Sequence, residues 1–158
     1  VKKCSDRSGL KNLMVKKLKR EDFLHTQKIP TRWQDNDVYH HVNNIIYYSF
    51  FDTVINKYLI DFGGLDFKKG PIIGLAVETH CEFYKPIQFP QIIDSCLRIV
   101  NLGNSSVKYE IGLFIENENE CVAFGHFVHV FVKRPENKPT SIPTQLRNCM
   151  SKLIYNKQ

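Results

Sequence analysis

The stretch VNNIIYYSFFDTVINKYLIDFGG, residues 42–64, decides how the rest of this chain must fold. Its polar residues recur three and four positions apart, which is the spacing of one helical face. They form a narrow stripe made up of Ser49, Asp52, Thr53, Asn56 and Lys57. The remaining circumference is predominantly apolar, so we expect a helix that is buried on most of its surface. The pair Gly63-Gly64 is suited to end it.

The sequence after residue 70 changes from helical spacing to alternation with a period of two. This pattern predicts four long strands, at 72–84, 92–100, 107–115 and 121–133. The polar separators at 103–106 and 116–120 are typical of hairpin turns. A short strand is expected at 26–33, before the helix.

The end of the chain predicts a second, amphipathic helix that starts at about Pro143. Its apolar face is expected to hold Leu146, Cys149, Met150, Leu153 and Ile154.

This order of elements predicts an α+β fold. A helix that is apolar nearly all round must be enclosed, and a flat sheet covers only one side of it. An antiparallel sheet curled around the helix is the simplest solution, with a sheet face or edge free to pair with a second copy. We therefore expect a single domain over residues 25–158, preceded by a basic arm over residues 1–24.

The net charge of +6 comes from the arm. Residues 1–20 hold eight Lys or Arg and one Asp, which gives +7 and leaves −1 for the other 138 residues. A nearly neutral body without a basic aromatic face argues against nucleic-acid binding. The arm itself can be a solvated extension, the remains of a targeting presequence, or a surface helix that meets phosphates or membrane. The expected location is therefore the cytoplasm or an organelle matrix, and no apolar run is long enough to span a membrane.

The five cysteines are widely spread and form no C-x-x-C pair, which argues against a zinc ribbon, a dithiol redox motif and a disulfide scaffold. Cys81, Cys96 and Cys121 lie in apolar runs and are expected to be buried, in a reducing compartment. Neither the pair His40-His41 nor the H-x-x-H stretch at 126–129 has metal-ligand spacing, so we expect no metal.

The loop RWQDNDVYHHVNN, residues 32–44, delivers polar groups to the start of the buried helix. Backbone N–H groups there lack partners inside the helix, and the helix dipole is positive. Such a terminus can stabilise an oxyanion, and Asp37 beside it could act as nucleophile or as general base. A purely structural interpretation is also open, with Asn43 or Asn44 as the helix cap and Asp35 or Asp37 as a turn former.

This loop resembles the motif of the 4-hydroxybenzoyl-CoA thioesterase-like branch of the hotdog-fold superfamily, in the residues DNDVYHHVNNIIY at 35–47. Three further stretches are similar to that branch: AVETHCEFYKPIQFP at 76–90, LGNSS at 102–106 and KPTSIP at 138–143. The resemblance covers about residues 26–155. It implies a curved antiparallel sheet around a central helix, a dimer or tetramer with active sites at the subunit interface, and hydrolysis of an acyl-CoA or acyl-carrier-protein thioester without a cofactor.

Carried over by position, the resemblance implies that Asp37 is the catalytic carboxylate and that the Asn44 N–H polarises the thioester carbonyl. His41 matches a histidine that assists in the plant acyl-carrier-protein thioesterases. Those enzymes have Asn where this chain has Tyr39, so the full Asp/Asn/His set is absent. The family's usual Gly is replaced by His40, so either the loop backbone differs or the turn tolerates a side chain.

The remaining candidates are substrate contacts. Asn43, Ser105 and Ser106 are assigned to substrate binding, although a hairpin would explain the two serines equally well. Lys133 and Arg134 could meet a CoA phosphate or be solvated. Tyr47 either lines the acyl tunnel or packs in the core. Trp33 is expected to pack.

Two other functions stay open beside the thioesterase. A hydratase on the same fold would need a different Asp-and-His motif. A non-catalytic acyl-thioester binding module would not need Asp37.

Overall fold

The computed structural model describes residues 18–155. Its elements are η1 (Arg20–Asp22), β1 (His25–Pro30), η2 (Trp33–Asp35), α2 (Asn44–Gly63), β2 (Ile72–Phe83), β3 (Ile92–Leu102), β4 (Ser106–Ile115), β5 (Cys121–Lys133), β6 (Lys138–Pro139) and α3 (Thr144–Ser151). The predicted central helix, four long strands and C-terminal helix are all confirmed.

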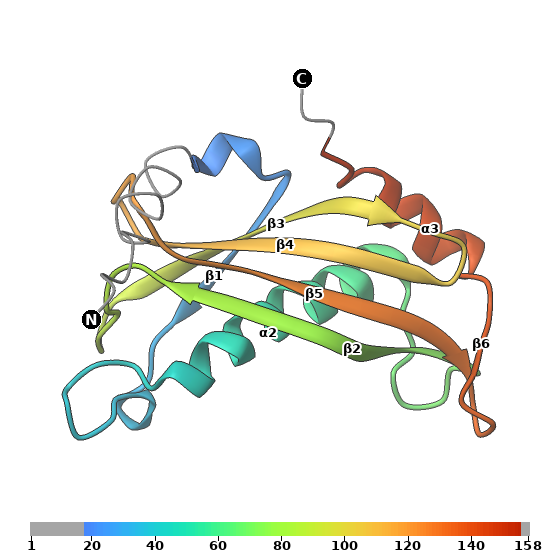
Figure 1. Ribbon diagram of the computed structural model, residues 1–158, viewed down its shortest axis with the longest axis horizontal. Helices are drawn as coiled ribbons and strands as arrows, with labels where there is room; N and C mark the ends of the chain where they lie inside the picture. Colours follow the sequence, from blue (N-terminus) through green and yellow to red (C-terminus); the bar gives the residue numbers. More distant parts are fainter. Residues whose placement is uncertain (1–17, 156–158) are drawn as a thin grey trace, which may run out of the picture.

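The strands form one antiparallel sheet in the order β1-β3-β4-β5-β2, with the short β6 on β5. The sheet curves around α2, which runs along its concave side, while α3 lies at the end where β3 finishes (Figure 1). This arrangement confirms the predicted hotdog fold. Strand β2 forms an edge of the sheet, so one side of its backbone has no neighbouring strand among the described residues.

The core lies between α2 and the concave face of the sheet. The largest buried side chains of α2 in this core are Tyr47, Phe50, Phe51 and Tyr58. The solvent-exposed face of α2 is wider than the predicted polar stripe, because it also includes Ile45, Ile60 and Phe62. The expectation that α2 is buried on most of its surface is therefore wrong for the single chain. No helix within residues 18–155 is long and apolar enough to cross a membrane.

Both ends of α2 are capped as its sequence predicts. The Asn43 side chain accepts a hydrogen bond from the Ile45 N–H at 3.2 Å and forms the N-cap. Gly64 ends the helix in the left-handed region, with φ 64°.

The segment before α2 differs from the prediction. Strand β1 ends at Pro30, since the chain then enters the short 3-10 helix η2 at Trp33–Asp35. Trp33 packs against Phe89 in a T-shaped arrangement, at a centroid distance of 5.8 Å, but its side chain is 79% exposed and lies outside the core.

Helix α3 closes one end of the core. Leu146, Cys149, Met150 and Leu153 are buried as predicted. Ile154 is exposed, because the helix ends at Ser151 and residue 154 forms a bridge to Ile99 instead.

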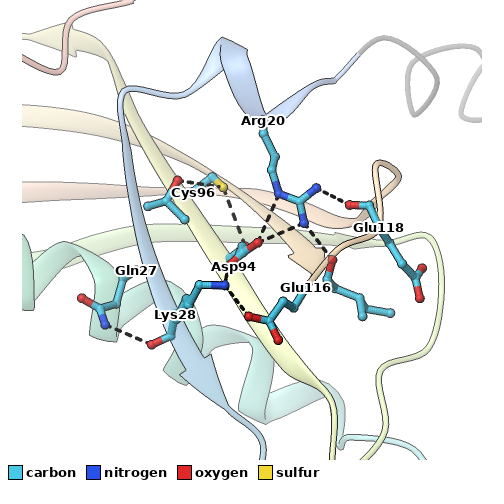
Figure 2. Close-up of polar contacts among 9 residues, drawn as sticks. Arg20, Gln27, Lys28, Asp94, Cys96, Glu116 and Glu118 are labelled. Carbon is cyan, nitrogen blue, oxygen red and sulfur yellow. Dashed lines mark hydrogen bonds and ion pairs between the residues drawn. The ribbon is translucent and has the colours of Figure 1, made fainter.

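Residues 18–24, which the sequence assigns to the arm, are held against the outer face of the sheet. Arg20 pairs with the buried Asp94 carboxylate at 3.0 Å and donates to the carbonyl oxygens of Ile115 and Glu118 (Figure 2). Asp94 Oδ1 lies within ion-pair distance of Lys28 Nζ, at 3.4 Å, without a hydrogen bond. Residues 1–17 lie outside the described part of the chain.

A small second core lies under this segment. It contains Phe23, Cys96, Phe114 and Cys121. Cys81, Cys96 and Cys121 are all buried, as the sequence predicts.

Candidate active site

The loop before α2 is fixed by a buried carboxylate. Asp35 is 1% exposed and accepts three hydrogen bonds from Arg32: from its N–H at 2.7 Å, from Nε at 3.0 Å and from Nη2 at 2.8 Å. The Asp35 carbonyl oxygen accepts from the Asn43 N–H at 2.9 Å. These hydrogen bonds connect η2 directly to the start of α2.

Asp37 begins the tight turn that follows. Its N–H donates to the His41 carbonyl oxygen at 2.8 Å, and its Oδ1 accepts from the Tyr39 N–H at 2.8 Å. His40 has φ 65°, the left-handed conformation that glycine adopts most readily. The turn therefore tolerates a side chain at this position.

The backbone N–H groups at the start of α2 and just before it donate hydrogen bonds, with one exception. The Val42 N–H donates to the Ile87 carbonyl oxygen at 2.7 Å, the Ile45 N–H to the Asn43 side chain and the Ile46 N–H to the Asn43 carbonyl oxygen at 2.9 Å. The Asn44 N–H has no acceptor among the described residues. It is the free donor at the positive end of the helix.

A cavity of about 520 Å³, which we call the Asp37 cavity, opens at this helix end. It is lined by Asp37, Tyr39, His41, Val42, Asn43, Asn44, Tyr47, Phe83, Tyr84, Lys85 and Pro86. Five residues singled out from the sequence, Asp37, His41, Asn43, Asn44 and Tyr47, thus share one space. The structural interpretation of this loop is confirmed for Asn43, which caps the helix, and for Asp37, which holds the turn with one oxygen. A catalytic role of Asp37 stays a prediction.

Tyr47 both lines the cavity and packs in the core. Its side chain is buried, and its hydroxyl oxygen accepts a hydrogen bond from the Ile87 N–H at 3.2 Å. Burial raises the pKa of Tyr47, so the phenol stays neutral at physiological pH.

The far wall of the cavity comes from the end of β2 and the three residues that follow it, and the sequence analysis did not predict it. Phe83, Tyr84, Lys85 and Pro86 supply it. These four residues belong to the stretch 76–90, which resembles the family, but the resemblance assigned no function to any of them. Tyr84 is oriented by a hydrogen bond to Glu82 Oε2 at 2.9 Å, and Lys85 pairs with Glu120.

The other four candidates lie at the opposite end of the sheet within this chain. Ser106 pairs with Val130 on β5, and Lys133 pairs with Ile72 at the start of β2. At about 3.3 Å per residue, Ile72 lies roughly 35 Å along β2 from Phe83. The Ser105 carbonyl oxygen accepts from the Phe131 N–H at 2.7 Å.

Arg134, at the same end, donates to the carbonyl oxygens of Phe67 and Lys68, at 2.7 and 3.0 Å. One chain therefore does not bring these four residues to Asp37. Within residues 18–155 no three His, Cys, Asp or Glu side chains gather as a metal site requires.

A curved sheet around a helix, with a carboxylate and a free N–H at the helix start, defines a protein of the hotdog thioesterase class. The comparison of sequences agrees: residues 31–149 match the family model of the thioesterase-like superfamily. The chain belongs to this superfamily, and this membership supports acyl-thioester hydrolysis as its general activity.

Solved structures with the same fold include a protein of Pseudomonas aeruginosa strain PAO1, PA5185. It is 51% identical, with a TM-score of 0.87 over 89% of this chain and 98% of that one. A putative thioesterase of Pseudomonas aeruginosa, PA2801, is 28% identical, with a TM-score of 0.75 over 81% and 98% of the two chains.

A DHNA-CoA thioesterase from Staphylococcus aureus shares the fold at 19% identity, with a TM-score of 0.72 over 80% and 88% of the chains. The sequence matches none of the curated proteins.

Proposed function

We propose that this protein is an acyl-thioester hydrolase that cleaves acyl-CoA, or an acyl-carrier-protein thioester, to the free acid and thiol. The observation that carries the proposal is that Asp37 and Asn44, whose N–H has no acceptor among the described residues, line the same cavity. A thioester carbonyl placed between them would have a donor for its oxygen and a carboxylate near its carbon.

The reaction adds water across the bond between the acyl carbon and sulfur. As a general base, Asp37 takes a proton from water, whose oxygen attacks the carbonyl carbon. As a nucleophile, it forms an acyl anhydride that water then hydrolyses. In both cases negative charge develops on the carbonyl oxygen, where the Asn44 N–H and the dipole of α2 stabilise it. His41, on the wall of the cavity, can give a proton to the leaving thiolate.

The proposed active form is a homodimer, as a pair or within a tetramer, in which the edges of two β2 strands pair. Val77 is 61% exposed, and Leu75 and Phe83 on the same strand are also exposed. An open edge strand with exposed apolar side chains is a site for pairing with another chain. Pairing across a twofold axis is antiparallel, so it sets the start of one β2 beside the end of the other.

The same pairing explains why four candidates lie far from Asp37 in one chain. Ser105, Ser106, Lys133 and Arg134 gather at the end of the sheet where β2 starts, so each copy would present them to the other copy's Asp37 cavity. There they could contact the CoA or pantetheine part of the substrate.

The test is release of free thiol from a panel of acyl-CoAs, from acetyl to palmitoyl and including aromatic acyl groups. Asp37→Asn keeps an oxygen that can accept from the Tyr39 N–H, so the turn should survive while the carboxylate is lost. We expect its rate to fall about 10²-fold or more, the scale of a lost general base. Asp61→Asn, a substitution on the exposed side of α2, is the matched control and should keep the wild-type rate.

Equal rates in the wild type and Asp37→Asn would reject the mechanism. A wild type that binds acyl-CoA and hydrolyses neither CoA nor carrier-protein esters would favour the non-catalytic binding module.

A separate measurement, of the oligomeric state, tests the proposed dimer. Val77→Lys sets like charges facing each other near the middle of the paired strands. Sedimentation should show the wild type as dimer or tetramer and the variant shifted toward monomer, with loss of thioesterase activity. A monomeric wild type would rule the pairing out.

A further inference from the structure

The convex face of the sheet, which points away from α2, carries an apolar strip along β5 and β2 (Figure 1). Val128 and Val130 of β5 point to this face and are half-buried, whereas the odd-numbered residues of the strand are buried on the concave side. On β2, Leu75 pairs with Val130 and is 38% exposed. Among the described residues, the segment 18–24 covers the part of this face around Phe114, while the strip itself stays partly open.

Charged side chains cross this strip in two neighbouring rows. One row is Lys108, Val128 and Glu78, and the next is Glu110, His126 and His80, taken in each case from β4, β5 and β2. Lys108 is half-buried and has no ion-pair partner within residues 18–155. Glu110 pairs with Arg98 through Oε2 at 2.6 Å, which leaves its Oε1 able to meet a second cation. A face on which opposite charges alternate from row to row fits a partner with the same pattern reversed.

A second copy of this chain has that reversed pattern. When a twofold axis runs across the strands between the two rows, Lys108 of each copy lies over Glu110 of the other. The same axis sets Glu78, whose side chain is 60% exposed, over His80 of the other copy. An axis placed on either row would instead set Lys108 over Lys108 or Glu110 over Glu110. The charges therefore select one register for the contact.

This register also covers the apolar strip. Val128 lies over His126 of the other copy, and Val130 lies over Phe124. Sheets that pack face to face are about 10 Å apart, and the side chains of the two faces interdigitate. Both α2 and α3 pack into the core on the concave side, so neither helix separates two convex faces.

The same axis is compatible with the proposed β2 dimer. Antiparallel pairing of two β2 edges needs a twofold axis perpendicular to the sheet, which reverses the strand direction and keeps both copies of α2 on one side. An axis across the strands meets this one at right angles. It reaches β2 between Glu78 and His80, close to the middle of the strand, where the pairing of two β2 edges is centred. Two such perpendicular axes close four copies into a tetramer.

We propose that the convex face binds the convex face of a second copy, and that two β2 dimers stack through this contact into a tetramer. The tetramer rests on the β2 dimer of the proposed function, whereas the face-to-face contact rests on the two charged rows and the apolar strip alone.

Two substitutions on the convex face test this contact by sedimentation velocity. Val128→Glu puts a carboxylate into the apolar strip, and Lys108→Glu sets a carboxylate over Glu110 of the other copy. We expect a tetramer for the wild type and a dimer for each variant. The rate of thiol release per chain should stay at the wild-type value in both, because the Asp37 cavities belong to the β2 dimer. Lys57→Glu, on the exposed side of α2, is the matched charge-reversal control and should remain tetrameric.

The two interfaces can be removed one at a time. Val77→Lys alone should halve the assembly and leave dimers joined by their convex faces, without thioesterase activity. Val77→Lys combined with Val128→Glu should give monomers. Lys108→Glu covers the case in which Val128→Glu fails to fold, since Lys108 has no ion pair to lose within residues 18–155.

The oligomeric state decides between the outcomes. A wild-type tetramer that neither Val128→Glu nor Lys108→Glu dissociates, or a wild-type dimer that both leave intact, would overturn the face-to-face contact and leave this face to a partner of another kind. A wild-type dimer that both substitutions split, while Val77→Lys does not, would support the contact and reject the β2 pairing. A wild type without thioesterase activity defeats the proposed function only, because the assembly is measured independently of activity.

Discussion

The hydroxyl oxygen of Tyr47, in the first turn of α2, accepts a hydrogen bond at 3.2 Å from the N–H of Ile87, in the loop after β2. The carbonyl oxygen of the same Ile87 accepts from the Val42 N–H at 2.7 Å. Ile87 is fully buried, and these two bonds join the two walls of the Asp37 cavity.

Tyr47→Phe should therefore destabilise the protein. It leaves the buried Ile87 N–H without its acceptor, which costs about 1–3 kcal/mol of unfolding free energy. Urea denaturation measures this loss. Tyr48→Phe is the control, because the Tyr48 hydroxyl bonds to none of the described residues, and an equal effect of both variants would contradict the role of the bond.

His40→Gly should stabilise the fold. The left-handed backbone at φ 65° costs a residue with a Cβ about 1 kcal/mol or more, and glycine removes most of that cost. The free energy of unfolding is expected to rise in His40→Gly and to fall or stay unchanged in Val38→Gly, a nearby substitution with no positive φ to relieve. A loss of stability in His40→Gly would show that the imidazole contributes more than the backbone strain removes.

The stability should decline as the pH falls below about 6.5, the ordinary pKa of histidine. Burial lowers the pKa of His129 in the folded state, and that of the half-buried His25 as well. Just below pH 6.5 the unfolded chain binds more protons than the folded one, so stability rises with pH and levels off above this value. Denaturation midpoints across this range should show a shallower slope for His129→Phe. A slope equal to that of the wild type would mean that His129 does not contribute.

The buried thiols should resist alkylation in the native state. Burial raises the pKa of Cys81 and Cys121 to about 12 and that of Cys96 to about 11, so almost no thiolate is present at neutral pH. Peptide mass spectrometry after iodoacetamide treatment should find Cys81, Cys96, Cys121 and Cys149 modified only after unfolding. Rapid native labelling of Cys96 would indicate local opening between β1 and β3.

The sequence pattern predicts most of the fold because each element carries its own periodicity. Helix α2 and the long strands follow from spacing alone, and Asp37, Asn43 and Asn44 follow from a motif that is continuous in the chain. The wall from Phe83 to Pro86 depends on where β2 ends relative to α2, which no local pattern specifies. His129 alternates along β5 like any core residue, and only the packing around it shows that its Nδ1 lacks a partner. The exposure of Trp33 could not be predicted either, because its aromatic character gives no sign that η2 turns the side chain outward onto Phe89.

The attachment of residues 18–24 to the sheet limits where the chain can be cut. Arg20 pairs with the Asp94 carboxylate (Figure 2), and Phe23 completes the small core with Phe114. Proteolytic maturation that removed the arm up to residue 24 would leave Asp94 without its arginine and uncover the Phe114 ring. Leu18 also packs against this core. If the arm carries a targeting signal, a processing site that preserves these contacts falls before Leu18, and a domain boundary for recombinant expression should be chosen there as well.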